Sequence, residues 1–301
     1  MRFLLSFLVL FSLVSNCKKD YYTVASGVST GTYTQFAKSL EILEGVKLKI
    51  LKTHGSQENV EAVRDGKADI AFTQIDNFEN LCMTDEDIRK EVKIVLPLYS
   101  EELHLLTTAE IKSLKDLKGK SISIGPRKSG IEGTAWGFFT IMGLDVSSFQ
   151  IKQGSSEDAL TDLENQKIDA MFIVAGAPVR LLSSLIPEKA KNIKIYSFNN
   201  RERLKMLDSA YQYQKATISP NVYPWNKQLV KTVSVDSIIV ASEDTDPEFI
   251  KKLLKDIFKN QETLRKAHSK WAEVSILKTR SVTRKLAGQM HTGTLAYLKE
   301  L

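Results

Sequence analysis

Four loops rich in glycine, serine and threonine are the segments of this sequence best suited to chemistry. They span residues 26–33, 53–59, 125–134 and 175–178. Each follows an apolar run typical of a strand, and each leads toward a segment typical of a helix. Free backbone N–H groups at helix starts attract anions, while glycine permits close approach and hydroxyl groups donate or accept hydrogen bonds. The loops therefore predict a site for a carboxylate or another small anion.

Capping is the alternative for any single loop, because the same residue types are the commonest helix caps and turns. Four such loops at the carboxyl ends of strands favour a shared cleft, since ligands of open α/β sheets bind there. Gln74 and Asn59 could orient a ligand or be ordinary surface residues. Arg127 could pair with a carboxylate or face solvent, and Tyr33 could contact the ligand or pack in the core.

The elements that must position these loops alternate along the chain. Short β-type runs, beginning with 22–25, alternate with amphipathic helical runs. This order predicts an α/β fold with mainly parallel sheets flanked by helices. Residues 92–99 and 103–108 are predicted as two separate strands, and 232–241 as a strand that returns to the first part of the fold.

The alternation restarts near residue 111, which indicates a second lobe. We expect residues 21–108 together with 217–301 to form lobe I, and residues 109–216 to form lobe II. A chain of this length exceeds one typical compact domain, so two lobes are also expected from size.

Composition narrows the class of function. The chain is 43% hydrophobic and 26% charged, which is typical of a globular protein, and its basic residues are interleaved with acidic ones. We therefore expect no nucleic-acid partner. The four histidines are scattered and no cofactor or metal site is expected. No Gly-x-Ser-x-Gly, Walker A or His-Glu-x-x-His motif occurs, and Asp76 with Glu79 lacks a matched base, so an enzyme is not expected.

The N-terminus predicts export. Residues 1–16 combine Arg2 with an apolar run that is too short to span a bilayer, as in a secretory signal peptide. The segment 13–17 resembles a bacterial lipobox, so Cys17 is the expected lipidation site and residues 17–20 the tether. The alternative is ordinary cleavage near Asn16 with Cys17 as a plain thiol. We expect a periplasmic or cell-surface protein attached to the membrane through its lipid anchor.

A series of motifs resembles the TAXI family of solute receptors, which serve tripartite ATP-independent (TRAP) transporters. The motifs occur in the family's order over nearly the whole mature chain, at residues 26–33, 53–59, 66–71 with Gln74, 113–119, 125–130, 168–172 with 176–178, and 290–294. The chain departs from the family pattern at Val28-Ser29 and at His54, where glycine is usual, so the resemblance does not define the solute.

The resemblance implies a two-lobed periplasmic-binding-protein fold of type II, with a cleft that closes on a carboxylate or amino acid. It also implies a TRAP-type membrane permease as the partner and a monomeric receptor. By motif match, the ligand-binding positions are Thr32, Tyr33, Ser56, Asn59, Gln74, Ser129, Thr134, Gly176 and Ala177. Two alternatives stay open: a surface lipoprotein or antigen that keeps the fold without transport, and an enzyme on the same bilobal fold.

Overall fold

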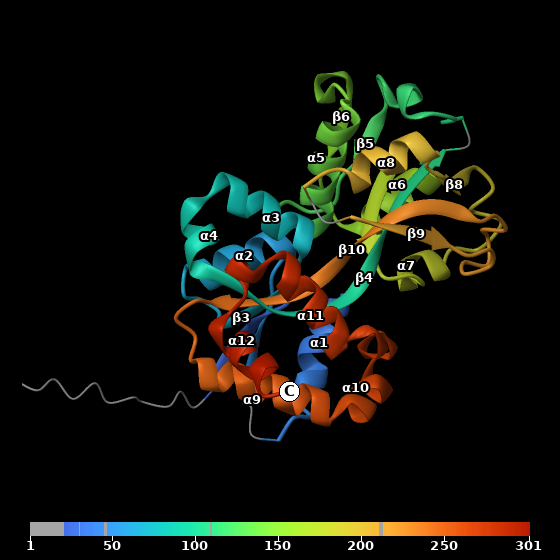
Figure 1. Cartoon of the computed structure of the whole chain (residues 1–301). Helices are drawn as coiled ribbons and strands as arrows, with labels where there is room; N and C mark the ends of the chain where they lie inside the picture. The colour runs from blue at the N-terminus through green and yellow to red at the C-terminus, as the bar shows by residue number, and fades with distance from the viewer. Residues whose placement is uncertain (1–20, 30, 45–46, 109, 211–212) are drawn as a thin grey trace, which may run out of the picture.

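A computed structural model describes residues 21–29, 31–44, 47–108, 110–210 and 213–301. The expected signal peptide and Cys17 lie outside these residues. The described strands form one sheet in the order β2-β1-β3-β10-β4-β7-β5-β6, with β8 beside β4 and β9 beside β10 (Figure 1). The strands are β1 (Tyr22–Ala25), β2 (Leu48–Leu51), β3 (Ile70–Gln74), β4 (Val92–Thr108), β5 (Ser121–Ser123), β6 (Gln150–Lys152), β7 (Ala170–Ala175), β8 (Ile193–Ile195), β9 (Gln214–Ile218) and β10 (Val230–Ser242).

The sheet divides into two halves, here called the first and the second lobe. In the first lobe, at the lower left of Figure 1, β1 pairs in parallel with β2 and β3. In the second lobe, at the upper right, β5 pairs in parallel with β6 and β7. Parallel neighbours need crossover connections, and helices supply them. The α/β class predicted from the alternation is therefore confirmed. The expected mainly parallel pairing holds only for β1–β3 and β5–β7, because β4 and β10 cross between the lobes and pair antiparallel with their neighbours.

Helices cover both lobes. The first lobe carries α1 (Thr32–Leu40), α2 (Ser56–Arg64), α3 (Ile75–Thr84) and α4 (Glu86–Glu91), and the C-terminal helices α9 (Pro247–Lys259), α10 (Gln261–Ala267), α11 (Ile276–Lys285) and α12 (Thr292–Lys299). The second lobe carries α5 (Gly130–Met142), α6 (Ser156–Glu164), α7 (Arg180–Ser183) and α8 (Asn200–Leu207). Short 3₁₀ turns lie at Leu114–Leu117, Val146–Ser148, Ser269–Glu273 and Ala287–Gln289. No helix of the described chain has both the length and the apolar character needed to cross a membrane.

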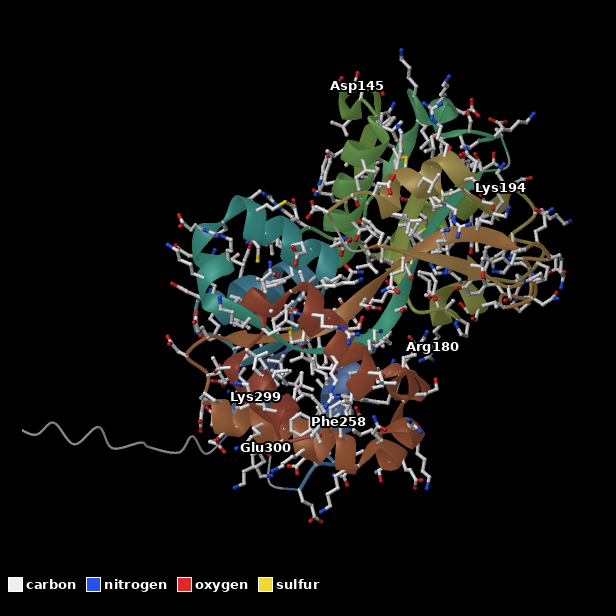
Figure 2. The ribbon with its side chains drawn as sticks, viewed as in Figure 1. Asp145, Arg180, Lys194, Phe258, Lys299 and Glu300 are labelled. Carbon is white, nitrogen blue, oxygen red and sulfur yellow. The ribbon has the colours of Figure 1, made fainter. Side chains whose placement is uncertain are left out.

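Two long antiparallel strands, β4 and β10, pass through both lobes. β10 pairs with β3 in the first lobe and with β9 in the second, and β4 pairs with β7 and β8 in the second. Figure 2 shows side chains packed on both sides of these strands where the lobes meet. Because both strands belong to both halves, the exact lobe limits expected from the sequence stay predictions.

The expected break between 92–99 and 103–108 is wrong, because β4 is continuous. The polar residues Ser100, Glu101 and Glu102 pair with Asp236, Val235 and Ser234 of β10, so the backbone ladder runs through the crossing point. A register shift in β10 lies directly beside this crossing. Polar residues are tolerated in the middle of β4 because this part of the strand lies between the two lobes and not in the apolar core of either one.

Apolar packing holds the elements in place. One buried cluster runs through both lobes and includes Phe78 of α3 and Phe138 of α5. A second cluster covers the other side of the first lobe, where Phe36 of α1 stacks on Trp271 with ring centroids 4.5 Å apart. Burying a large apolar side chain contributes roughly 1.5 to 3 kcal/mol, so these clusters stabilise the fold that positions the loops.

His104 makes a testable contribution to stability. It is fully buried on β4, with Nδ1 2.8 Å from the Glu102 carbonyl oxygen and Nε2 2.8 Å from the Tyr223 hydroxyl. Burial lowers the pKa of His104 to about 4. The unfolded chain therefore binds a proton that the folded chain excludes, and stability present above about pH 6.5 is lost as the pH falls toward 4.

We expect the free energy of unfolding to fall by up to about 3 kcal/mol over that pH range. Urea unfolding of the wild type and of His104→Gln at pH 7 and pH 4.5 measures the effect. The variant should be less stable at pH 7 and should depend less on pH. An equal pH dependence in the two proteins would contradict this assignment.

Candidate functional site

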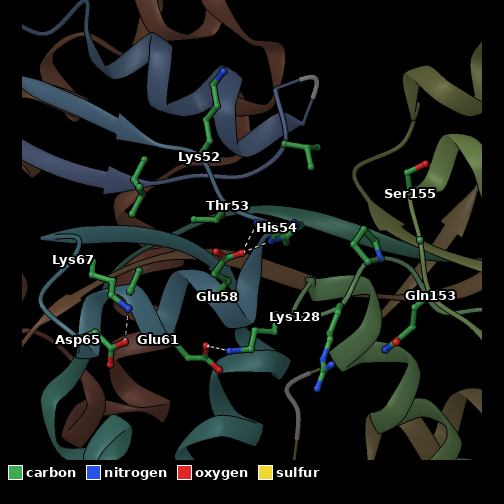
Figure 3. A pocket seen from close by; sticks show the side chains of 16 residues that line it. Lys52, Thr53, His54, Glu58, Glu61, Asp65, Lys67, Lys128, Gln153 and Ser155 are labelled. Atoms are coloured by element: carbon green, nitrogen blue, oxygen red, sulfur yellow. Dashed lines mark hydrogen bonds and ion pairs between the residues drawn. The ribbon is translucent and has the colours of Figure 1, made fainter.

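A cavity of about 860 Å³ lies between the lobes at the carboxyl ends of β2, β5 and β6 (Figure 3). The first lobe contributes the loop that contains Lys52, Thr53 and His54, and one face of α2. The second lobe contributes the segments 126–128 and 153–155. Three of the four predicted loops therefore line this cavity: 26–33, through Val28, and 53–59 from the first lobe, and 125–134 from the second. Loops from both lobes around one cavity are the arrangement expected for a shared cleft.

Two contacts bridge the cavity from lobe to lobe. Lys128 Nζ of the second lobe lies 2.6 Å from Glu61 Oε2 of α2, and the Glu58 backbone N–H donates to the Lys128 carbonyl oxygen at 3.2 Å (Figure 3). Lys128 has φ +62°, a backbone conformation that side chains rarely adopt. The ion pair is half exposed and adds little stability, but both contacts must break when the lobes separate.

Glycine lets the lobes meet at the inner end of this cavity. Gly55 has φ +126°, and a Cβ there would lie 3.5 Å from the Gly130 nitrogen and 3.7 Å from the Ser129 Cα atom. A Cβ on Gly130 would overlap Gln74 Oε1 and would lie 2.6 Å from Ser56 Oγ. We call this contact of Gly55, Ser129 and Gly130 the seam.

Behind the seam lies a cluster of buried polar side chains from both lobes. Ser56 Oγ accepts from the Gln74 backbone N–H at 3.1 Å and lies 3.4 Å from Gln74 Oε1. Asn77 Nδ2 donates to Gln74 Oε1 at 3.1 Å and to the Gly130 carbonyl oxygen at 3.2 Å. The predicted residues Ser56 and Gln74 are therefore brought together with the start of α5.

Asp76 ties the same region to two further parts of the second lobe. Its Oδ2 atom accepts from Thr134 Oγ1 at 2.6 Å and from the Tyr213 hydroxyl at 2.8 Å. Burial raises the pKa of Asp76, and the hydrogen bonds from Thr134 and Tyr213 oppose that shift. Thr134, predicted from the motif match, thus contacts the first lobe directly.

Glu101 lies at the centre of the crossing strands and is only 4% exposed. Its Oε2 atom accepts from Gln74 Nε2 at 2.7 Å. Burial raises the pKa of Glu101 to about 8, against the lowering effect of the Gln74 amide and the neighbouring hydroxyl groups of Tyr99 and Tyr33. The carboxyl group therefore holds a proton at neutral pH.

Other predicted residues make local contacts. Asn59 Nδ2 donates to the carbonyl oxygens of Ser26 and Phe72, each at 2.6 Å, and Ser129 Oγ caps α5 by accepting from the Glu132 N–H. Ser129 thus has the capping role that the sequence left open. The alternative of a surface residue is wrong for Asn59, which is fully buried because its amide joins the ends of β1 and β3. Thr32 is the half-buried first residue of α1.

The fourth predicted loop lies at the crossing strands. The Ala177 backbone N–H donates to Glu102 Oε2 at 2.7 Å. A Cβ on Gly176 would lie 2.7 Å from Lys270 Cε and 3.3 Å from the Ser100 carbonyl oxygen. Side chains of β4 alternate between its two faces, so Glu102 and Ala177 lie on the face opposite Glu101.

Sequence reasoning missed Glu101, Asn77, Gly130 and Tyr213. Two adjacent acidic residues within an apolar run, Glu101 and Glu102, were a usable signal, because ionisable residues in a central strand are rarely buried without a reason. Asp76 lies in the same region of the sequence as Glu79, but without a matched base the pair did not indicate a site. Among the described residues, no group of His, Cys, Asp and Glu side chains has an arrangement suited to a metal ion.

Comparison with known proteins identifies the family. Residues 18–301 match the NMT1-like family. The chain belongs to that family. Its fold is similar to a Listeria monocytogenes protein assigned as an L-cystine ABC transporter, with a TM-score of 0.50, 17% identity and coverage of 85% of this chain and 98% of that one.

Two further structures share the fold of this NMT1-like chain. The GluR0 ligand-binding core from Nostoc punctiforme, in complex with L-glutamate, has a TM-score of 0.50 and 17% identity, covering 83% of this chain and 98% of that one. A Bordetella bronchiseptica protein has a TM-score of 0.56 and 17% identity, and the match covers 83% of this chain and 76% of that one. The predicted two-lobed periplasmic-binding-protein fold is thus confirmed.

Proposed function

We propose that this protein is an extracytoplasmic receptor that captures a small solute between its lobes and delivers it to a TRAP-type membrane permease. One observation carries the proposal. The two lobes, joined by β4 and β10, enclose a cluster of buried polar groups, and the seam separates this cluster from the 860 Å³ cavity. Membership of the NMT1-like family and the fold shared with a glutamate-bound core support it.

The geometry suggests how capture works. Rotation of the lobes about β4 and β10 separates Gly55 from Gly130 and uncovers Ser56 and Gln74. A solute that enters from the cavity is then enclosed when the lobes close again. Closure is favoured only by contacts that the solute makes in the closed state. The expected ligand positions Tyr33, Ser56, Gln74, Ser129 and Thr134 stand at or behind the seam. Thr32 and Asn59 lie farther along the same loops, and Gly176 and Ala177 lie in the loop beside Glu102.

The solute proposed is a carboxylate or an amino acid. Backbone N–H groups at the start of α5 and the hydroxyl groups of Ser56 and Ser129 suit such a ligand. We assign binding rather than catalysis because, in the described part of the chain, no Ser, Thr or Cys side chain is hydrogen-bonded to a histidine side chain. The motif series supports the TAXI subgroup, the TRAP partner and a lipid anchor on Cys17.

A thermal-shift screen of the purified protein against carboxylates and amino acids tests the proposal. A solute present at about 100 times its dissociation constant adds about 2.7 kcal/mol to the free energy of unfolding, which raises the melting temperature measurably. We expect at least one small carboxylate or amino acid to give this shift. Isothermal titration of each hit excludes non-specific stabilisation. Unchanged melting temperatures across both classes would argue against a transport receptor and in favour of the surface-antigen alternative.

A further inference from the structure

The Glu101 carboxyl group is buried without a cation. Among the described residues, Glu101 takes part in no ion pair, and the side chains around its carboxyl group are all neutral: the Gln74 amide, which donates to Oε2 at 2.7 Å, and the hydroxyl groups of Tyr99 and Tyr33. An ionised carboxylate can accept about four hydrogen bonds. Burying a carboxylate without a charged partner costs several kcal/mol. A carboxyl group buried in this way is stable in the fold if it binds a proton or if a ligand brings a positive charge to it.

A second buried group beside Glu101 also lacks a partner. The Tyr33 hydroxyl of α1 is shielded from solvent, yet no acceptor or donor lies within hydrogen-bond geometry of it. It lies next to the carboxyl group of Glu101 and the hydroxyl of Ser56, both of which influence the pKa of Tyr33. Buried hydroxyl groups in proteins are nearly always hydrogen-bonded. Two incompletely satisfied groups thus stand side by side, directly behind the seam through which a solute would pass.

We propose that Glu101 is the specificity-determining residue of the cleft and that it receives a positively charged group of the solute, a primary ammonium. This inference rests on the proposed function and narrows it from carboxylates in general to solutes that carry an amino group. The Tyr33 hydroxyl then accepts a second hydrogen bond from the same ammonium. A solute that lacks the amino group leaves both protein groups unsatisfied, which is the strongest source of discrimination available to a polar site.

Proton linkage provides a readout that a purely structural role would not produce. The titratable groups that face Glu101 are Tyr33 of α1, Tyr99 of β4 and Asp76 of α3. Burial raises the pKa of both tyrosines, so both stay neutral near neutral pH. Since burial also raises the pKa of Glu101 to about 8, an ammonium must displace a proton from it. Affinity should therefore increase about tenfold per pH unit up to about pH 8.

The experiment compares matched solutes that differ only in the amino group. L-glutamate is paired with glutarate, and L-norvaline with valerate, in isothermal titrations at pH 6, 7 and 8. We expect binding of an amino-bearing member, tighter at higher pH, with about one proton released in buffers of different ionisation enthalpy. Glu101→Gln should weaken binding by about 30-fold or more and remove the pH dependence.

Glu79→Gln serves as the matched control, because Glu79 is a partly buried carboxyl group on α3 that lies beside Gln289 and away from the seam. It should bind as the wild type does. Equal affinity for an amine and its deaminated partner would overturn the role of Glu101 while leaving the receptor function intact. Absence of binding by every carboxylate and amino acid would overturn both. The wild-type pH series decides the question even if Glu101→Gln does not fold.

Discussion

Replacement of Asp76 by alanine should lower the free energy of unfolding by about 3 to 5 kcal/mol, because several buried hydrogen bonds lose their acceptor at about 1 to 3 kcal/mol each. Asp76 is 3% exposed and accepts from Thr134, from Tyr213 and from the Asn77 backbone N–H. Alanine removes the shared acceptor of the Thr134 and Tyr213 hydroxyl groups and leaves a small void beside them. Each unsatisfied buried donor costs about 1 to 3 kcal/mol.

Urea unfolding monitored by circular dichroism measures this effect. Asp162→Ala is the control, because it removes only a surface ion pair of 3.4 Å with Lys167 and should change stability by less than about 0.5 kcal/mol. A double-mutant cycle with Tyr213→Phe should show coupling, since both changes affect the same hydrogen bond. A loss below about 1 kcal/mol, with no coupling, would mean that Asp76 does not tie the lobes together.

Gly130→Ala should keep the lobes from closing fully. The added Cβ would overlap Gln74 Oε1 and crowd Ser56 Oγ. Gln74 cannot swing aside freely, because it is 2% exposed and its amide is bonded to both Glu101 and Asn77. Overpacking of this kind costs about 1 to 3 kcal/mol, and the cost falls on the closed state alone. We therefore expect solute affinity to fall by about tenfold or more.

Small-angle scattering and isothermal titration measure the two consequences. The radius of gyration of Gly130→Ala should exceed that of the wild type, because an open pair of lobes is more extended. Gly137→Ala on the same helix is the matched control: its nearest neighbour would be the Tyr213 hydroxyl at 3.8 Å, an ordinary contact. It should leave scattering and affinity unchanged. A wild-type radius and affinity in Gly130→Ala would rule out the seam as the closing surface.

Local patterns in the sequence were sufficient for much of the fold. The strand expected at 22–25 is β1, and the alternation of short apolar runs with amphipathic ones indicated the α/β class. Gln74 stands at the end of β3, and Ser129 caps α5, as the position of Ser129 in a Gly/Ser/Thr loop suggested. These features depend on side-chain periodicity and capping, which act between residues only a few positions apart.

The partners of the site residues were decided by tertiary structure alone. Thr134 lies 58 positions from Asp76 and Tyr213 lies 137 positions from it, so no local pattern connects them. The continuity of β4 through Ser100–Glu102 was missed for the same reason, since these polar residues resemble a break until β10 pairs with them. The sequence by itself determined which segments form strands, helices and loops. The burial of Glu101 and the close approach of Gly130 to Gln74 arise only when two lobes pack together, because desolvation and steric contact depend on neighbours in space.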